Sequence, residues 1–232
     1  ASDVYKRQGQ MLLVDRVKSS VAKRHGAIVF RADLEHLGSP SQISSALTHL
    51  IADGVLVRLG EGIYAKTCRD EQGKIKPAGA AEPLVHEILL KLGIDPKNSC
   101  TEEQDGQTRV IVDEPARRVS RHLVVDTGPV EIVSPSALKK NHTVPSDPKG
   151  LPRRNVGKYI AVIARMHHVS PERTGLDQWA EAVSRAAGDT VQLDDVGRLL
   201  AKLKQQQVIT GKQMAHLMNN YVTERHEANA HV

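Results

Sequence analysis

The stretch from Ser39 to Lys66 constrains the fold of this chain most, because it joins an amphipathic helix pattern directly to a hairpin pattern. Ser39 is a favourable N-cap, and Pro40 at the first helical position already has the φ that a helix requires. An apolar stripe follows at helical spacing: Ile43, Leu47, Leu50 and Ile51. Gly54 can adopt the left-handed conformation that ends a helix, so we expect a helix from residue 40 to about residue 53.

Two short β-type runs come directly after this helix. Residues 55–59 and 63–65 are rich in Val, Leu, Ile and Tyr, and Gly60-Glu61-Gly62 separates them. This pattern predicts a β-hairpin. A helix followed at once by a small hairpin is typical of a winged helix-turn-helix, which binds DNA with the helix in the major groove.

The outward positions of the helix favour DNA binding. They are short, polar and mostly uncharged: Ser41, Gln42, Ser44, Ser45, Thr48 and His49. Gln can pair with adenine, and Ser or Thr with several base edges. We expect Arg31, Arg58 and Lys66 to contact phosphates around the hairpin. The alternative is an ordinary solvated helix packed on a hairpin.

Composition restricts the class of protein. The formal net charge of +5 is compatible with DNA binding without requiring it, and residues 11–68 carry seven basic and five acidic side chains, a difference of only +2. We therefore expect a homodimer or a second basic surface to strengthen binding. Cys68 and Cys100 form no Cys-x-x-Cys pair, so neither a zinc site nor a disulfide framework is expected. No cofactor is expected either. No apolar run approaches the roughly 20 residues that span a bilayer, and we expect a cytoplasmic protein.

The pattern predicts an α+β protein in several parts. Residues 1–10 are interpreted as an assembly artefact or a disordered tail, because residues 3–8 look like a translated sequencing adapter. Residues 11–68 are expected to form the winged helix-turn-helix, 69–81 a linker and 82–190 a small α/β domain. An α-hairpin and tail are expected over residues 191–232.

Within the expected α/β domain, helices are predicted over residues 82–92, 157–168 and 177–187, and β-strands over 109–112, 122–125 and 130–133. The turn signal Asp126-Thr127-Gly128 predicts that the last two strands pair. Residues 134–154 form a basic loop that is a candidate second contact surface, through Lys139, Lys140, Arg153 and Arg154.

An enzyme is not expected, because the sequence lacks a Gly-rich phosphate loop, His-Glu-x-x-His and Gly-x-Ser-x-Gly. Some acidic residues near the predicted strands, with a downstream lysine, loosely resemble a metal-dependent nuclease: Asp113, Glu114, Asp126, Glu131 and Lys139. The spacing does not fit, and solvated turn residues explain them better. His167 and His168 are adjacent on a helix and point about 100° apart, which does not suit one metal ion.

The N-terminal part resembles the AbiEi-type antitoxin family of type IV toxin–antitoxin systems, through the 39–54 helix and the Arg58 to Tyr64 hairpin. A weaker likeness to related antitoxin-like proteins continues through short motifs at residues 82–93, 128–132, 151–152 and 179–189. The resemblance covers about residues 12–190, and the α-hairpin after residue 190 has no counterpart in it.

The resemblance implies that the winged helix binds double-stranded operator DNA and represses its own operon. It also implies that residues 82–190 oppose a nucleotidyltransferase-like toxin, with or without a stable complex. A stand-alone winged-helix regulator with a ligand-sensing or dimerisation domain is the alternative. The sequence does not identify the operator, the toxin, the oligomeric state or the true N-terminus.

Overall fold

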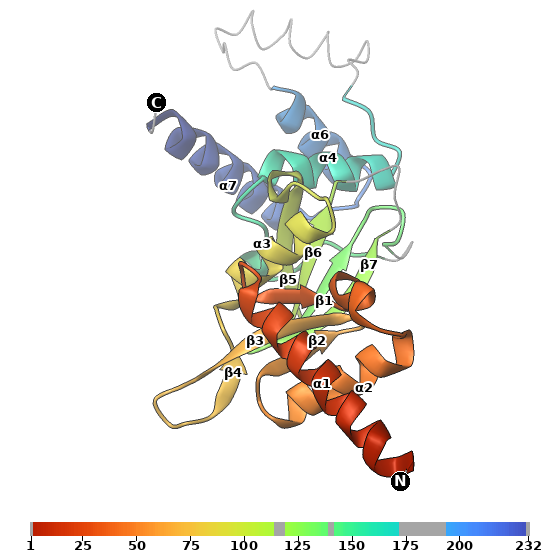
Figure 1. The fold of residues 1–232 in the computed structure, drawn as a ribbon. Helices are drawn as coiled ribbons and strands as arrows, with labels where there is room; N and C mark the ends of the chain where they lie inside the picture. Colours follow the sequence, from red (N-terminus) through yellow and green to blue (C-terminus); the bar gives the residue numbers. More distant parts are fainter. Residues whose placement is uncertain (1, 114–118, 139–141, 172–193, 231–232) are drawn as a thin grey trace, which may run out of the picture. The chain divides into compact units, whose positions relative to one another are not determined.

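A computed structural model of the chain describes residues 2–113, 119–138, 142–171 and 194–230 (Figure 1). The described chain is a mixture of helices and β-strands, as expected for the α+β class. It divides into two compact units, and the division is not sequential: unit 1 contains residues 1–96 and 121–131, and unit 2 contains residues 97–120 and 132–232.

Unit 1 begins with helices and short strands in alternation. Its elements are α1 (Ser2–Lys23), β1 (Ile28–Phe30), the 3-10 helix η1 (Arg31–Leu37), α2 (Pro40–Ala52), β2 (Leu56–Gly60), β3 (Ile63–Arg69), β4 (Ile75–Pro77) and α3 (Ala81–Lys91). The backbone of α1 is already helical from Ser2. Residues 1–10, interpreted from the sequence as an assembly artefact or a disordered tail, thus contribute helical backbone from Ser2 onward.

The core of unit 1 lies where α1, η1 and α2 pack against the strands. Buried apolar side chains come from the helical stripe and from the strands: Leu13, Val17, Val21, Val29, Leu34, Ile43, Leu47, Leu50, Leu56 and Tyr64. The predicted stripe of α2 is therefore buried except at its end, where Ile51 is 37% exposed. Gly54 has a φ of +68°, as the predicted helix end requires.

The sheet of unit 1 is larger than the expected hairpin. Strands β1, β3, β2 and β7 (Ser120–Val125) are neighbours in that order, and β4 pairs with the free continuation of β3. The pairs β1–β3, β2–β3 and β3–β4 are antiparallel. β7 adjoins β8 (Gly128–Val133) across a tight turn, which confirms that the last two predicted strands pair.

The described part of unit 2 contains a β-hairpin, two short 3-10 helices and three α-helices. Its elements are η2 (Pro96–Asn98), β5 (Ser99–Gln104), β6 (Gln107–Val112), η3 (Pro148–Gly150), α4 (Val156–Met166), α6 (Asp195–Gln205) and α7 (Gly211–Ala230). β5 and β6 pair antiparallel over six residues. The two C-terminal helices share one apolar core with α4, through side chains such as Ile160, Leu200 and Leu217.

Three boundaries differ from the expected organisation. The predicted linker contains β4, which is hydrogen-bonded to β3. The first helix of the expected α/β domain, α3, groups with unit 1, as does most of the β7–β8 hairpin. The expected separate α-hairpin is part of the core of unit 2, because its apolar faces cover α4. The helix predicted over 177–187 lies outside the described residues.

Candidate nucleic-acid interface

The start of α2 is held by reciprocal hydrogen bonds between Ser39 and Gln42. The Ser39 hydroxyl accepts a hydrogen bond from the backbone N–H of Gln42 at 3.4 Å, and Gln42 Oε1 accepts one from the backbone N–H of Ser39 at 3.0 Å. This is a capping box, and Pro40 occupies the first turn. It defines where the outward face of the helix begins.

The side chains predicted to read DNA lie together on that face. Ser41, Gln42, Ser44, Thr48 and His49 are exposed, and Ser45 is half-buried. Two of the hydroxyls are already used as donors: Ser44 to the Pro40 carbonyl at 2.9 Å, and Thr48 to the Ser44 carbonyl at 3.0 Å. Each of the two hydroxyl oxygens keeps its lone pairs and can still accept a hydrogen bond from another group.

Gln42 is the residue whose expected role changes most. Bidentate pairing with adenine needs both the carbonyl oxygen and the amide nitrogen of a glutamine. In the structure the Gln42 oxygen already accepts the Ser39 N–H, so a bidentate contact to a base would have to share this oxygen with the helix cap. The sequence pattern Ser-Pro-Ser-Gln contains this signal, because Gln three residues after an N-cap Ser is the capping-box spacing.

Two of the three residues expected to contact phosphates, Arg31 and Arg58, lie beside the first turn of α2 and the β2–β3 turn. Arg31 donates from its guanidinium to the Pro40 carbonyl at 3.1 Å, and its backbone N–H bonds to the Gly62 carbonyl at 2.9 Å. Arg58 is exposed and bonds to the Gly60 carbonyl at 3.2 Å. Arg31 therefore ties the helix to the turn, and both arginines add positive charge there.

Lys66 does not lie where the sequence pattern placed it. Its ammonium group is half-buried and donates to the Arg24 carbonyl at 2.6 Å, at the end of α1. It holds α1 to β3 and is not free to bind phosphate. Arg153 and Arg154 of the second predicted surface are exposed in unit 2, whereas Lys139 and Lys140 lie outside the described residues.

The outer edge of the β2–β3 hairpin is covered. β7 pairs with β2 at Gly60, opposite Leu123. A Cβ atom at Gly60 would lie 2.6 Å from the His122 carbonyl oxygen, so glycine allows the two backbones to approach. This strand contact, which the sequence pattern did not predict, limits which side of the hairpin can meet DNA.

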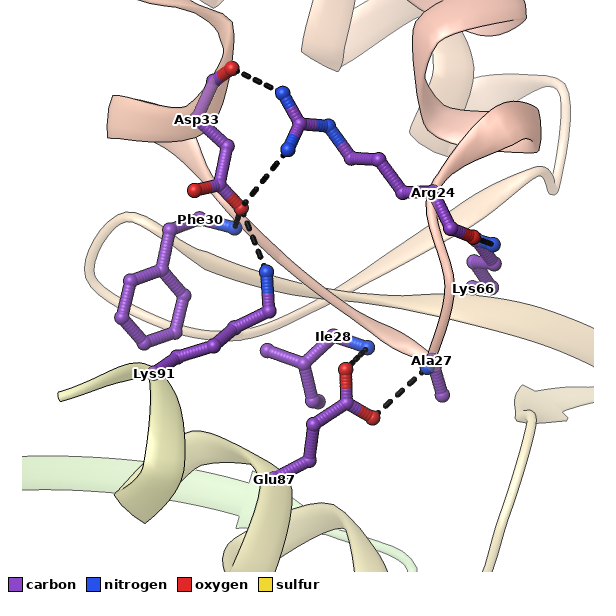
Figure 2. A network of polar contacts seen from close by, with 8 residues as sticks. All are labelled: Arg24, Ala27, Ile28, Phe30, Asp33, Lys66, Glu87 and Lys91. Atoms are coloured by element: carbon purple, nitrogen blue, oxygen red, sulfur yellow. Dashed lines mark hydrogen bonds and ion pairs between the residues drawn. The ribbon is translucent and has the colours of Figure 1, made fainter. Parts of the chain in front are cut away.

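A polar network fastens α3 to the strand that supports α2 (Figure 2). The Glu87 carboxylate of α3 accepts the backbone N–H groups of Ala27 at 2.8 Å and Ile28 at 3.0 Å. Gly26 precedes them with a φ of +82°, and a Cβ there would collide with the Glu87 carboxylate. α3 is thus part of the scaffold of unit 1.

The same network centres on Asp33 of η1. Its carboxylate accepts the Phe30 N–H at 3.0 Å and the Lys91 ammonium at 2.8 Å, and Arg24 lies 3.9 Å away. Burial alone would raise the pKa of Asp33, but the hydrogen bonds from Lys91 and Phe30 and the nearby positive charges outweigh it and lower the pKa. Lys91 also lies 5.6 Å from the centre of the Phe30 ring.

Replacing Glu87 with alanine should therefore loosen the scaffold behind α2. It leaves the N–H groups of Ala27 and Ile28 without acceptors, and Ile28 is fully buried, so we expect a loss of about 1–3 kcal/mol in the free energy of unfolding. Hydrogen exchange should show faster exchange at the Ile28 amide. His86→Ala, at the exposed neighbouring position, is the control, and equal protection in both variants would contradict the assignment.

Unit 2 contains a buried charged cluster around Glu102 of β5. Glu102 is 1% exposed, and its carboxylate accepts hydrogen bonds from Arg109 at 2.8 Å, His142 Nε2 at 2.7 Å and the Tyr159 hydroxyl at 2.7 Å. The Nδ1 atom of His142 is buried and bonds to no group in the described part of the chain. The side chains of Glu102, His142 and Tyr159 are buried while that of Arg109 is partly exposed, which is the arrangement of a structural network.

The residues of the weak nuclease-like pattern have other surroundings. Asp113 forms an ion pair with Arg165, and Asp126 is exposed in the β7–β8 turn. Glu114 and Lys139 lie outside the described residues. Across residues 2–113, 119–138, 142–171 and 194–230, no three His, Cys, Asp or Glu side chains gather where they could hold a metal ion.

Burial raises the pKa of the Cys100 thiol, and the nearby Glu102 and Asp113 carboxylates raise it further. The thiol of this buried cysteine therefore stays protonated, which does not suit a nucleophile. No helix within the described ranges is both long enough and apolar enough to cross a bilayer.

Comparisons with models of protein families, with curated proteins and with solved structures found no match for this chain.

Proposed function

We propose that unit 1 is a winged helix that binds double-stranded DNA with α2 in the major groove. The observation that carries the proposal is the exposed face of α2, whose side chains are short, polar and mostly uncharged while its opposite stripe is buried. The order α1, β1, η1, α2, β2, β3, with β1 paired to β3 and β2 to β3, supports it. A helix with such a face can approach base edges closely.

In the cell this binding would control the protein's own operon. The resemblance to AbiEi-type antitoxins supports an autoregulating antitoxin whose partner is a nucleotidyltransferase-like toxin. Unit 2 would then carry the surface that opposes the toxin, because the proposal assigns unit 1 to DNA. A toxin gene beside this gene, lethal when expressed alone, would support the antitoxin role; DNA affinity that changes with a small ligand would instead support a stand-alone regulator.

The test of DNA binding is a titration of the full chain with DNA from upstream of its own gene, with a scrambled duplex as control. We expect preference for the upstream DNA that persists as salt is raised from about 50 to 200 mM, since base contacts depend less on salt than phosphate contacts do. Equal binding to both duplexes that disappears at the higher salt would contradict sequence-specific recognition.

Thr48→Glu tests the face itself. The new carboxylate would stand on the exposed side of α2, against the negative DNA, and we expect a loss of about tenfold or more in affinity, or about 1.4 kcal/mol. Ser19→Glu places the same charge on the exposed side of α1 and is the matched control. Unchanged affinity of Thr48→Glu, or equal losses in the two variants, would show that α2 does not enter the groove.

A further inference from the structure

A second hairpin of unit 1 projects from the body of the unit, at the left of Figure 1. The first part of β3 pairs with β2, up to Lys66 opposite Leu56. The last three residues of β3 pair instead with β4, from Thr67 opposite Pro77 to Arg69 opposite Ile75. We refer to residues 66–77 as the basic arm.

The tip of the basic arm is held by its own hydrogen bonds. Asp70 Oδ1 accepts the backbone N–H groups of Gln72 at 3.0 Å and Lys74 at 2.9 Å. The Asp70 N–H donates to the Lys74 carbonyl at 3.0 Å, and Gly73 takes the positive φ of +76° that this turn needs. The Asp70 carboxylate therefore stabilises the turn by accepting backbone hydrogen bonds. The space beside Gly73 is open, because a Cβ there would meet no atom within 4 Å.

Three positive side chains of the arm are exposed: Arg69, Lys74 and Lys76. Arg69 donates to the Gly73 carbonyl at 3.3 Å, within the arm. Among the described residues, no ion pair engages either lysine. Glu71 is the one exposed carboxylate in residues 66–77, because Asp70 is half-buried in the turn. The arm thus offers cations to an acidic partner.

The base of the arm is fixed to the C-terminal end of α2. The Thr67 hydroxyl donates to the Gly54 carbonyl at 2.5 Å, and the Thr67 N–H donates to the Val55 carbonyl at 3.2 Å. Ile75 covers Gly54 so closely that a Cβ there would lie 2.4 Å from Ile75 Cδ1. The arm consequently keeps a defined place beside the helix.

We propose that the basic arm contacts DNA phosphates beside the C-terminal end of α2. The proposal rests on the proposed function of unit 1. A helix of 13 residues is about 20 Å long, whereas the major groove is about 12 Å wide, so both helix ends lie near a phosphate backbone. Arg31 lies at the first turn of α2, and the arm supplies positive charge at the other end. Phosphate contacts of this kind position a protein without reading sequence.

The double variant Lys74→Ala/Lys76→Ala tests the arm in the full chain. Binding to the duplex from upstream of its own gene is measured by fluorescence anisotropy over about 50–200 mM salt. Loss of two phosphate contacts should make the slope of log affinity against log salt shallower by about 1.8, at about 0.9 per contact. The ratio of affinities for upstream and scrambled DNA should stay the same. Lys204→Ala/Lys212→Ala removes two exposed lysines of unit 2 and is the matched control.

Lys74→Arg/Lys76→Arg keeps the charge and should keep the wild-type slope. A slope of Lys74→Ala/Lys76→Ala equal to that of the wild type, or a loss of upstream preference in this variant, would overturn the arm as a phosphate contact. An equal change in the unit 2 control would overturn it as well. If the wild type binds neither duplex, the proposed function fails and the arm fails with it, which is a different result from binding with an unaltered slope.

Discussion

Glu102→Ala is expected to destabilise unit 2 by about 3–5 kcal/mol, because it removes a buried carboxylate and leaves the buried side chains of His142 and Tyr159 without their shared acceptor. Arg109, His142 and Tyr159 all donate to this one carboxylate, and Tyr159 is fully buried. Urea unfolding followed by circular dichroism measures the total loss. Amide hydrogen exchange should become faster in β5, β6 and α4, whereas β1 and β3 should stay as protected as in the wild type.

Glu103→Ala is the control for this prediction. Glu103 is the next residue of β5, and its side chain points to the exposed side, so a loss within about 0.5 kcal/mol is expected. Similar losses for the two variants would mean that the buried cluster adds nothing specific to stability. Glu102→Gln keeps the size and removes the charge, and should fall between the two because one amide oxygen can still accept.

The contribution of Glu102 should also depend on pH. Burial would raise the pKa of Glu102, but the hydrogen bond and charge of His142 and the hydrogen bonds from Tyr159 and Arg109 outweigh it and lower the pKa. A folded pKa below the unfolded value of about 4.3 gives stability that is present above about pH 4.3 and is lost as the pH falls toward the folded pKa. The wild type should therefore lose stability across this acidic window, and Glu102→Gln should lose less.

Gly150→Ala is expected to have the second largest effect. A Cβ at Gly150 would lie 1.9 Å from the Glu103 carbonyl oxygen and 3.3 Å from Pro145 Cβ. The carbonyl belongs to β5, which is paired with β6, so it cannot move without disturbing the sheet. We expect a loss of about 3 kcal/mol in the free energy of unfolding, at the upper end for an overpacked site.

The matched control is Gly211→Ala, at the start of α7. A Cβ there meets only Lys204 Cε, at 4.0 Å, and alanine is a better helix former than glycine. This control should be neutral or slightly stabilising in the same urea unfolding measurement. If Gly150→Ala is equally well tolerated, the close approach of residue 150 to β5 is not a feature of the folded chain.

Local signals predicted local structure well. The Ser39 cap and the turn at Gly54 place the two ends of α2. A capping box also begins α7, where Thr210 and Gln213 are bonded to one another at the capping-box spacing. Each of these signals depends only on residues a few positions apart. The local sequence is therefore sufficient to predict where the helix begins or ends.

Two strands that the sequence pattern did not predict, β4 and β5, lack a run of alternating apolar residues. β5 reads Ser-Cys-Thr-Glu-Glu-Gln, and its second inward side chain is Glu102, so no apolar alternation marks it. The Asp105-Gly106 pair between β5 and β6 was the available signal, since Asp-Gly is a preferred hairpin turn. β4 is three residues long and pairs with a part of β3 whose apolar content is low.

The sequence by itself determined the elements whose causes are local: the caps, the helical stripes, the glycine turns and the outward polar face of α2. Tertiary structure alone decided which unit each element joins and what several polar side chains do. Glu87 meets Ala27 from 60 residues away, and Glu102 meets Tyr159 from 57. The Lys66 ammonium group likewise bonds to a group that is distant in sequence, the Arg24 carbonyl at the end of α1. A buried polar group must find a partner, and no local pattern shows which distant group the folded chain will bring to it.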